Sequence, residues 1–323
     1  MLSEIFWLFQ TLTACFGIFI NGLLIYTVLF YTPESIKTYS LIILSHAISD
    51  FLACLFHIFT HARFIGTEFT ISYASSGLCK YLDSPAACDF AYSFYIHFSS
   101  FSLYMILVSF SYRWWILTKS SPTSRALLGV CFAFYIPCFL QVIAFCIAGS
   151  KPIDIYRVIH KKYPDYDLSG YQINGQLDIR NIFSLYGFCH LLLPAQPIYC
   201  IIIFLRFRII GHLKEAAGHM SKNTRAMHKQ LLTCLTIQAM LPMLNIIAIS
   251  LFALQLFSIF SDPLIEENML FFLLLIPTIS PIVSFVFIKP YRRIILKMAG
   301  KKIDEKRDTF GPSSVSKIEP SKM

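Results

Sequence analysis

The sequence predicts an all-α fold, a bundle of seven helices that cross a lipid membrane. Of its 323 residues, 56% are hydrophobic and only 14% are charged, whereas roughly 25% are charged in a typical soluble domain. The chain also contains 31 Phe and 17 Tyr, an amount of apolar surface that lipid solvates without cost. Seven apolar stretches are long enough to cross the bilayer, because about 20 helical residues span a hydrocarbon core of about 30 Å.

The expected spans form one transmembrane domain over residues 1–298. They cover residues 5–31, 40–60, 86–112, 127–149, 181–205, 230–257 and 268–288. Prolines interrupt several spans, and we expect kinks there, because neighbouring helices, hydroxyl groups and waters satisfy the carbonyls that proline frees. We expect the first span to be retained, because no basic residue precedes it and it exceeds the about 7 to 15 apolar residues of a signal peptide.

The basic residues predict an N-terminus outside the cell and a C-terminus in the cytoplasm. Twenty of the 27 Lys and Arg residues fall in segments that this orientation places inside, and seven fall outside, in agreement with the positive-inside rule. Residues 290–298 mix cations with apolar side chains, which predicts a short amphipathic helix on the inner leaflet. We expect the polar residues 299–323 to be disordered. No basic face interleaved with aromatic residues accompanies the net charge of +9, so nucleic acid is not an expected partner.

Three polar residues within or beside the spans are candidates for function, because polar groups in a membrane are costly. Asn21 lies in the first span and Asp50 in the second. The two side chains could share hydrogen bonds or hold a water or a cation, either as structural links between helices or as part of a switch. Arg113 follows Tyr112 at the cytoplasmic boundary of the third span, where an arginine can also serve as an interfacial anchor.

These positions resemble motifs of the seven-helix G-protein-coupled receptors. The segment ending at Asn21 resembles the first-helix motif of that superfamily, and Asp50 resembles its second-helix aspartate. Residues 112–114, Tyr-Arg-Trp, resemble its third-helix Asp-Arg-Tyr. The resemblance implies that Tyr112 and Arg113 take part in G-protein coupling, and that Asn21 and Asp50 belong to the switch.

Two prolines extend the resemblance toward the C-terminus. Pro242 resembles the sixth-helix proline of these receptors, and Pro281 stands where their seventh helix carries Asn-Pro-x-x-Tyr. Here that stretch is Ser-Pro-Ile-Val-Ser, which lacks both the Asn and the Tyr. The resemblance therefore assigns both prolines to the switch, without the usual polar partners around Pro281.

A closer resemblance links the chain to the nematode serpentine chemoreceptors, particularly class delta and its relatives in the Str group. Four segments carry it: residues 31–54, 77–79, 112–115 and 280–295. The resemblance implies detection of a small chemical in the outer half of the bundle and activation of a heterotrimeric G protein inside. It also implies a plasma-membrane location, in the cilium of a sensory neuron, and no cofactor.

The residues of the third and fifth spans suggest an aromatic ligand pocket. Tyr95 stands where amine receptors of the superfamily carry an aspartate, so a cationic amine is not the expected ligand. The seventh span contains no lysine, so no retinal Schiff base can form there. The candidate ligand residues are Tyr92, Tyr95, His97, Ser100, Tyr186 and His190. Packing between helices is the alternative role of each.

One disulfide is expected from the family pattern, in which the third helix begins near a bonded cysteine. Cys88 lies 25 residues before Arg113, the separation found in the family, but residues 150–180 contain no cysteine to serve as the usual partner. Cys79, nine residues earlier, is the nearest candidate in an oxidising outer compartment. We therefore predict a bridge between Cys79 and Cys88, with Cys146 as the second candidate partner.

Two other function classes compete with a receptor. His57 and His61 lie four residues apart on one helical face and could bind zinc, as in seven-span hydrolases. Those proteins have the opposite orientation, and no Gly-x-Ser-x-Gly motif is present, so we do not expect an enzyme or a metal site. A seven-span ligand-gated channel or a transporter is the other alternative, although the two halves of the chain show no matching repeats.

Overall fold

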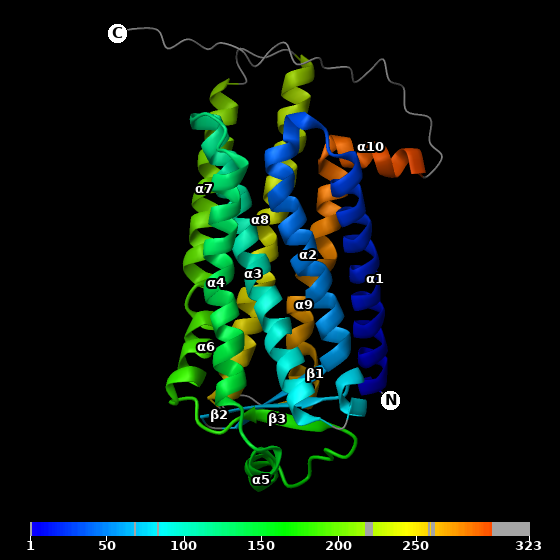
Figure 1. The fold of residues 1–323 in the computed structure, drawn as a ribbon, viewed down its shortest axis with the longest axis vertical. Helices are drawn as coiled ribbons and strands as arrows, with labels where there is room; N and C mark the ends of the chain where they lie inside the picture. The colour runs from blue at the N-terminus through cyan, green and yellow to red at the C-terminus, as the bar shows by residue number, and fades with distance from the viewer. Residues whose placement is uncertain are drawn as a thin grey trace.

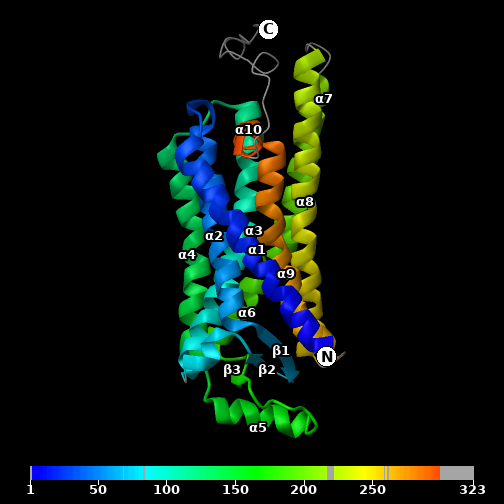
Figure 2. The same cartoon turned by 90° about the vertical axis from the view of Figure 1, so that its right-hand side faces the viewer.

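A computed structural model describes residues 2–67, 69–82, 84–216, 222–257, 259 and 262–298. In these residues, seven helical stretches are long and apolar enough to cross a membrane, and they pack side by side into a bundle (Figures 1 and 2). The helices are α1 (Leu2–Tyr31), α2 (Lys37–Thr60), α3 (Pro85–Thr118), α4 (Ser124–Ala148), α6 (Ile182–Leu192) continuing into α7 (Ala195–Ala216), α8 (Lys222–Leu256) and α9 (Pro263–Phe287). The predicted seven-helix transmembrane bundle is confirmed.

Burial separates a central helix from peripheral ones. In α3, 89% of the membrane-spanning window is buried, against 33% in α1 and in α4. Phe16, Phe19 and Phe132 are therefore exposed on the outside of the bundle, where lipid would solvate them. The position of α3 explains why His97 and most serines of this helix are buried although they are polar.

The expected span over residues 181–205 consists of two helices. Helix α6 ends at Leu192 and α7 begins at Ala195. Pro194 and Pro197 lack the N–H groups that would bond to the carbonyls four residues earlier. The two helices together form one candidate span from Ile182 to Glu215, and the interruption at the prolines lies within it.

A three-stranded antiparallel sheet closes one end of the bundle. Strand β1 (Ala62–Thr67) pairs with β2 (Thr70–Ser75), and β2 pairs with β3 (Gln172–Gln176). Helix α5 (Pro152–Lys162) lies beyond the sheet (Figure 2). We call the three strands, the short 3₁₀ helix η2 (Leu78–Leu82) that follows β2, and α5 the lid, and the two ends of the bundle the lid end and the α10 end. The lid was not predicted from the sequence, because its strands come from two loops about 100 residues apart.

Both faces of the lid are buried. On the bundle side, Phe64 and Tyr73 pack with Tyr92, Tyr95 and Phe252. On the opposite side, the apolar residues of the strands pack against Ile155, Ile159 and Leu168 of the loop that contains α5. The lid is therefore a two-layered cap rather than a loose surface loop.

Two short 3₁₀ helices and one terminal helix complete the described elements. They are η1 (Glu34–Ile36), η2 (Leu78–Leu82) and α10 (Lys289–Met298). Helix α10 runs across the end opposite the lid (Figure 1), and its Tyr291 is fully buried and lies 3.0 Å from the hydroxyl of Thr32. The tail expected over residues 299–323 lies outside the described residues.

Gly66 is expected to be essential for the close packing of the lid against α8. A Cβ atom at this position would collide with the backbone carbonyl of Gln255 in α8, whereas a Cβ at Gly129 in α4 would meet nothing within 4 Å. Because a backbone cannot move aside as a side chain can, Gly66→Ala should destabilise the protein by about 3 kcal/mol. Thermal unfolding of the purified protein measures this loss, and Gly129→Ala is the matched control that should leave stability unchanged or slightly raised.

Candidate functional site

The lid is attached to α3 by a disulfide and by hydrogen bonds. Cys79 and Cys88 form a disulfide with Cα atoms 5.1 Å apart, and Cys146 is a free cysteine. The hydroxyl of Tyr73 in β2 donates a hydrogen bond to Asp89 at the start of α3. These links connect the lid directly to the central helix, so a movement of the lid would displace α3.

A buried ion pair attaches the lid to α9. The guanidinium of Arg63 in β1 donates two hydrogen bonds to Oε2 of Glu266, at 2.7 and 3.0 Å, and Tyr166 donates to Oε1 of the same carboxylate at 3.1 Å. Glu266 is completely buried. Burial lowers the pKa of Arg63, but the hydrogen bonds and charge of Glu266 more than offset this effect and raise it. The sequence showed a basic residue in a loop and an acidic residue before a span, with nothing to pair them across 203 positions.

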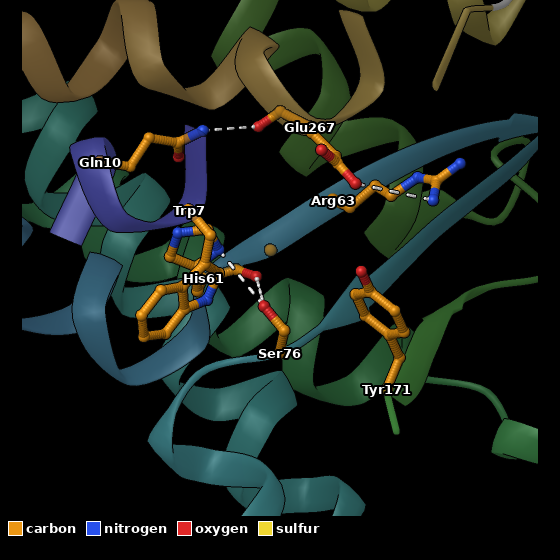
Figure 3. Close-up of a pocket in the computed structure, with 8 residues that line it drawn as sticks. Trp7, Gln10, His61, Arg63, Ser76, Tyr171 and Glu267 are labelled. Carbon is orange, nitrogen blue, oxygen red and sulfur yellow. Dashed lines mark hydrogen bonds and ion pairs between the residues drawn. The ribbon is translucent and has the colours of Figure 1, made fainter. Parts of the chain in front are cut away.

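Beside this ion pair lies a small polar crevice between α1, the lid and α9 (Figure 3). Its volume is about 20 Å³, sufficient for one water molecule, which needs about 10–15 Å³. Trp7 lies against His61, with ring centroids 5.2 Å apart, and Gln10 donates a hydrogen bond to the backbone carbonyl of Glu267. Burial lowers the pKa of His61 to about 4, so its imidazole is neutral near pH 7. The crevice is too small for an organic ligand.

Two of the predicted ligand residues, Tyr92 and Tyr95, lie directly under the lid. The ring of Tyr92 stacks on Tyr73 of β2 with centroids 3.9 Å apart. The hydroxyl of Tyr95 donates to the carbonyl of Leu270 in α9 at 2.9 Å, and its ring lies 5.3 Å from that of His57. These two tyrosines therefore connect the lid, α3 and α9.

Three of the other predicted ligand residues lie where α3, α4 and α6 meet. His97 is fully buried, and its ring packs edge-on against Tyr135 of α4. Tyr186 donates a hydrogen bond to the carbonyl of Pro137 in α4, and the ring of His190 lies 6.0 Å from that of Tyr186. Ser100 is buried in α3. The structure thus separates Tyr92 and Tyr95 from His97, Tyr186 and His190. None of the six predicted residues lines any of four cavities in the described part of the chain, which have volumes of about 20, 20, 360 and 290 Å³.

Asn21 and Asp50 have separate partners near the middle of the bundle. Pro281 has no N–H group, so it cannot donate a hydrogen bond to the carbonyl of Pro277. The side-chain amide of Asn21 donates to that carbonyl instead, at 2.7 Å. Asp50 accepts a hydrogen bond from Ser102 of α3 at 2.7 Å, and His46 lies 3.4 Å from its second oxygen. Asn21 therefore supports the proline kink of α9, whereas Asp50 joins α2 to α3.

Arg113, which is buried, forms a cluster at the α10 end with partly buried residues of α2 and α8. It donates hydrogen bonds to the hydroxyl of Tyr39 at 2.6 Å and to the side-chain carbonyl of Gln238 at 2.9 Å. The ring of Tyr39 also stacks on Tyr112, and its hydroxyl lies 3.0 Å from Ser109. We call Tyr39, Arg113 and Gln238 the arginine cluster. Neither Tyr39 nor Gln238 was identified from the sequence, because their pairing with Arg113 depends on how three helices pack.

A cavity of about 20 Å³ lies between the arginine cluster and His46, the neighbour of Asp50. Tyr39, His46, Gln238 and Ser280 are among its lining residues, and the space again suffices for one water. Ser280 directly precedes Pro281 in α9, and Pro242 lies in α8 one helical turn after Gln238. Polar groups of α2, α3, α8 and α9 therefore surround this cavity.

The two histidines considered for zinc lie at the lid end of α2 with ring centroids 5.5 Å apart. Among the described residues, no group of three or more His, Cys, Asp or Glu side chains is arranged to hold a metal ion. His57 is fully enclosed beside Tyr95. Both rings therefore belong to the packing under the lid.

Comparison with known proteins identifies relatives along almost the whole chain. The family model described as serpentine type 7TM GPCR chemoreceptor Srd matches residues 6–297. Serpentine receptor class delta-18 of Caenorhabditis elegans is 33% identical over 284 residues, which cover 87% of this chain and 84% of the relative. Serpentine receptor class delta-19 of the same organism is 32% identical over 88% of this chain and 85% of the relative. Serpentine receptor class delta-1 is 30% identical over 88% and 78%.

Proposed function

Because this chain belongs to the Srd family of serpentine seven-transmembrane chemoreceptors, we propose that it binds a small chemical near the lid and activates a heterotrimeric G protein at the α10 end. As a family member it is a multi-pass membrane receptor, and its relatives are receptors rather than enzymes. The G protein, the ligand site and the location in a sensory cilium are parts of the proposal.

The arginine cluster is the observation that supports G-protein coupling most directly. Arg113 is buried and hydrogen-bonded to Gln238, which belongs to another helix. A guanidinium in this position becomes available to a protein partner only when α3 and α8 separate at the α10 end. The cluster therefore has the properties of a contact that holds a receptor inactive until a ligand acts elsewhere.

The links at the lid end support a ligand effect that is transmitted through α3. Tyr92 contacts the lid strand β2, and Tyr95 bonds to α9. Asp50 of α2 bonds to α3 halfway along the bundle, and Arg113 lies near the α10 end of α3. Helix α3 thus contacts the lid at one end and carries the arginine cluster at the other.

The proposed orientation places the lid outside the cell and α10 in the cytoplasm. It is supported by the excess of basic residues in the segments at the α10 end, and by the disulfide in the lid, since disulfides persist in oxidising compartments. Lys289, Arg292, Arg293 and Lys297 would then contact the anionic inner leaflet from α10.

The proposal is tested in cells that express the receptor with an N-terminal and a C-terminal epitope tag. Antibody should label the N-terminal tag on intact cells and the C-terminal tag only after permeabilisation. A panel of volatile and water-soluble chemicals should then produce a response that disappears when the G proteins of the cell are inactivated. Reversed labelling, or a ligand-dependent current that persists without active G protein, would instead indicate a channel and contradict the proposal.

A further inference from the structure

The lid blocks a direct path from the aqueous phase to the residues beneath it. All six residues of β1 and all six of β2 are buried, and the fully buried Ile155 and Ile159 of α5 cover the sheet from outside. The disulfide, the ion pair between Arg63 and Glu266, and the contact of Gly66 with the backbone of α8 hold the lid in place.

The largest of the four described cavities opens beside the lid rather than through it. It has a volume of about 360 Å³ and is lined by Phe69, Ile179, Arg180, Leu185, Phe188, Leu256 and Phe257. These residues belong to the turn between β1 and β2, the connection from β3 to α6, α6 itself and the lid end of α8. The volume falls at the lower end of the range of about 300–1,000 Å³ found for small-molecule sites.

The lining of this side cavity favours a neutral, mostly apolar ligand. Six of its seven lining residues are apolar. The seventh, Arg180, forms an ion pair with Asp178 at 3.0 Å, and its guanidinium lies over the ring of Phe69. The arginine charge at the cavity is therefore already compensated, and an anionic ligand would have to compete with Asp178.

The inner wall of the side cavity is continuous with the core under the lid. The ring of Phe188 lies 5.9 Å from that of Phe252, which lies 4.4 Å from Phe64 of β1. Phe64 and Phe252 belong to the same buried cluster as Tyr92 and Tyr95. An occupant of the side cavity would thus press on the aromatic side chains that contact α3.

A buried glutamine without a hydrogen-bond partner among the described residues lies behind this wall, next to the lining residue Leu256 but outside the lining itself. Gln255 is 1% exposed, and within the described residues neither its amide nitrogen nor its carbonyl oxygen has a partner. It precedes Leu256 of the cavity lining and lies one helical turn after Phe252, on the same side of α8. An unsatisfied buried amide destabilises the folded protein by about 1–3 kcal/mol. A ligand group that bonds to the amide would remove this penalty and so favour binding.

From these observations we propose that the receptor binds a neutral lipophilic molecule with one hydrogen-bonding group, which reaches the side cavity from the membrane between α6 and α8. Its apolar part fills the cavity, and its polar group bonds to Gln255, whose side chain turns toward the cavity when the ligand is bound. This inference rests on the proposed chemoreceptor function and adds the chemical class of the ligand and its route. It also gives the unpaired amide of Gln255 a role.

Photolabelling of the purified full-length receptor in phosphatidylcholine vesicles tests the inference without a G protein. The probe is a medium-chain alkanol that carries a diazirine, and the comparison probe is the corresponding alkane without the hydroxyl group. We expect saturable labelling by the alkanol of peptides that contain Leu185 and Leu256, and at least about tenfold weaker labelling by the alkane, the ratio that one good hydrogen bond provides.

Two substitutions with a matched control make this test specific. Leu185→Trp should fill the cavity and reduce saturable labelling about tenfold or more, whereas Ile182→Trp, on the exposed side of α6 and outside the lining, should not. Gln255→Leu should abolish the preference for the alkanol, and it should preserve or raise the melting temperature because it removes an unsatisfied buried amide.

The result that would overturn the inference is labelling that increases without saturation and is equal for both probes in the wild type and in Gln255→Leu. Such labelling would mean that membrane phospholipid alone occupies the cavity. Equal labelling of Leu185→Trp and the wild type would exclude the side cavity as the site. Because these readouts measure binding only, they remain independent of the G-protein test described above.

Discussion

Glu266→Leu is expected to destabilise the protein by about 3–5 kcal/mol, one of the two largest effects predicted here. The substitution removes the hydrogen-bonded partner of Arg63 and leaves the buried guanidinium with only the more distant carboxylate of Glu267, at 3.9 Å. It also removes the acceptor of the Tyr166 hydroxyl. Since this carboxylate joins the lid to α9, the loss should appear as a lower melting temperature of the purified receptor and as fewer molecules at the cell surface.

The double variant Arg63→Leu, Glu266→Leu is the control for this prediction. Replacing both members of a buried ion pair by apolar residues is often neutral or stabilising, because neither charge then remains buried alone. The double variant should therefore recover most of the stability lost in Glu266→Leu. If the single variant is as stable as the wild type, water reaches the pair, and the lid is not sealed at this position.

Arg113→Ala is expected to abolish signalling while surface expression and ligand binding persist. If the guanidinium contacts the G protein after α3 and α8 separate, its removal eliminates that contact without affecting the lid end. The measurement is the ligand-dependent G-protein response of the variant, normalised to its surface amount. A normal response would show that Arg113 acts only as an anchor at the membrane boundary.

Gln238→Leu should have the opposite effect on the resting receptor. It removes the hydrogen bond that ties Arg113 to α8, and a bond to a charged group contributes about 1.5–3 kcal/mol. If this bond exists only in the inactive state, its loss should raise basal signalling about tenfold or more. Gln141→Leu is the control, because the buried Gln141 of α4 has no hydrogen-bond partner within the described residues, whereas the partly buried Gln238 bonds to Arg113.

Several features of this receptor follow from the sequence alone, because they are local properties of the chain. A run of about 20 apolar residues specifies a membrane-spanning helix whatever its neighbours are, so the seven helices could be predicted one at a time. The proline at position 281 likewise predicts a freed carbonyl four residues earlier. What it does not predict is that Asn21, 256 residues away, satisfies that carbonyl.

The tertiary structure alone decided the contacts that give the candidate sites their properties. The strands of the lid pair only after the bundle has brought the loop after α2 near the loop before α6. The pairing of Arg63 in β1 with Glu266 in α9, and of Arg113 in α3 with Gln238 in α8, depends in the same way on elements that are distant in sequence. Five of the six residues predicted as a ligand pocket lie in two groups, because residues on one helix face different neighbours around its circumference. A run of hydrophobic residues can be recognised within a short segment of the sequence. Hydrogen bonds and ion pairs between distant elements instead depend on the geometry of the whole bundle.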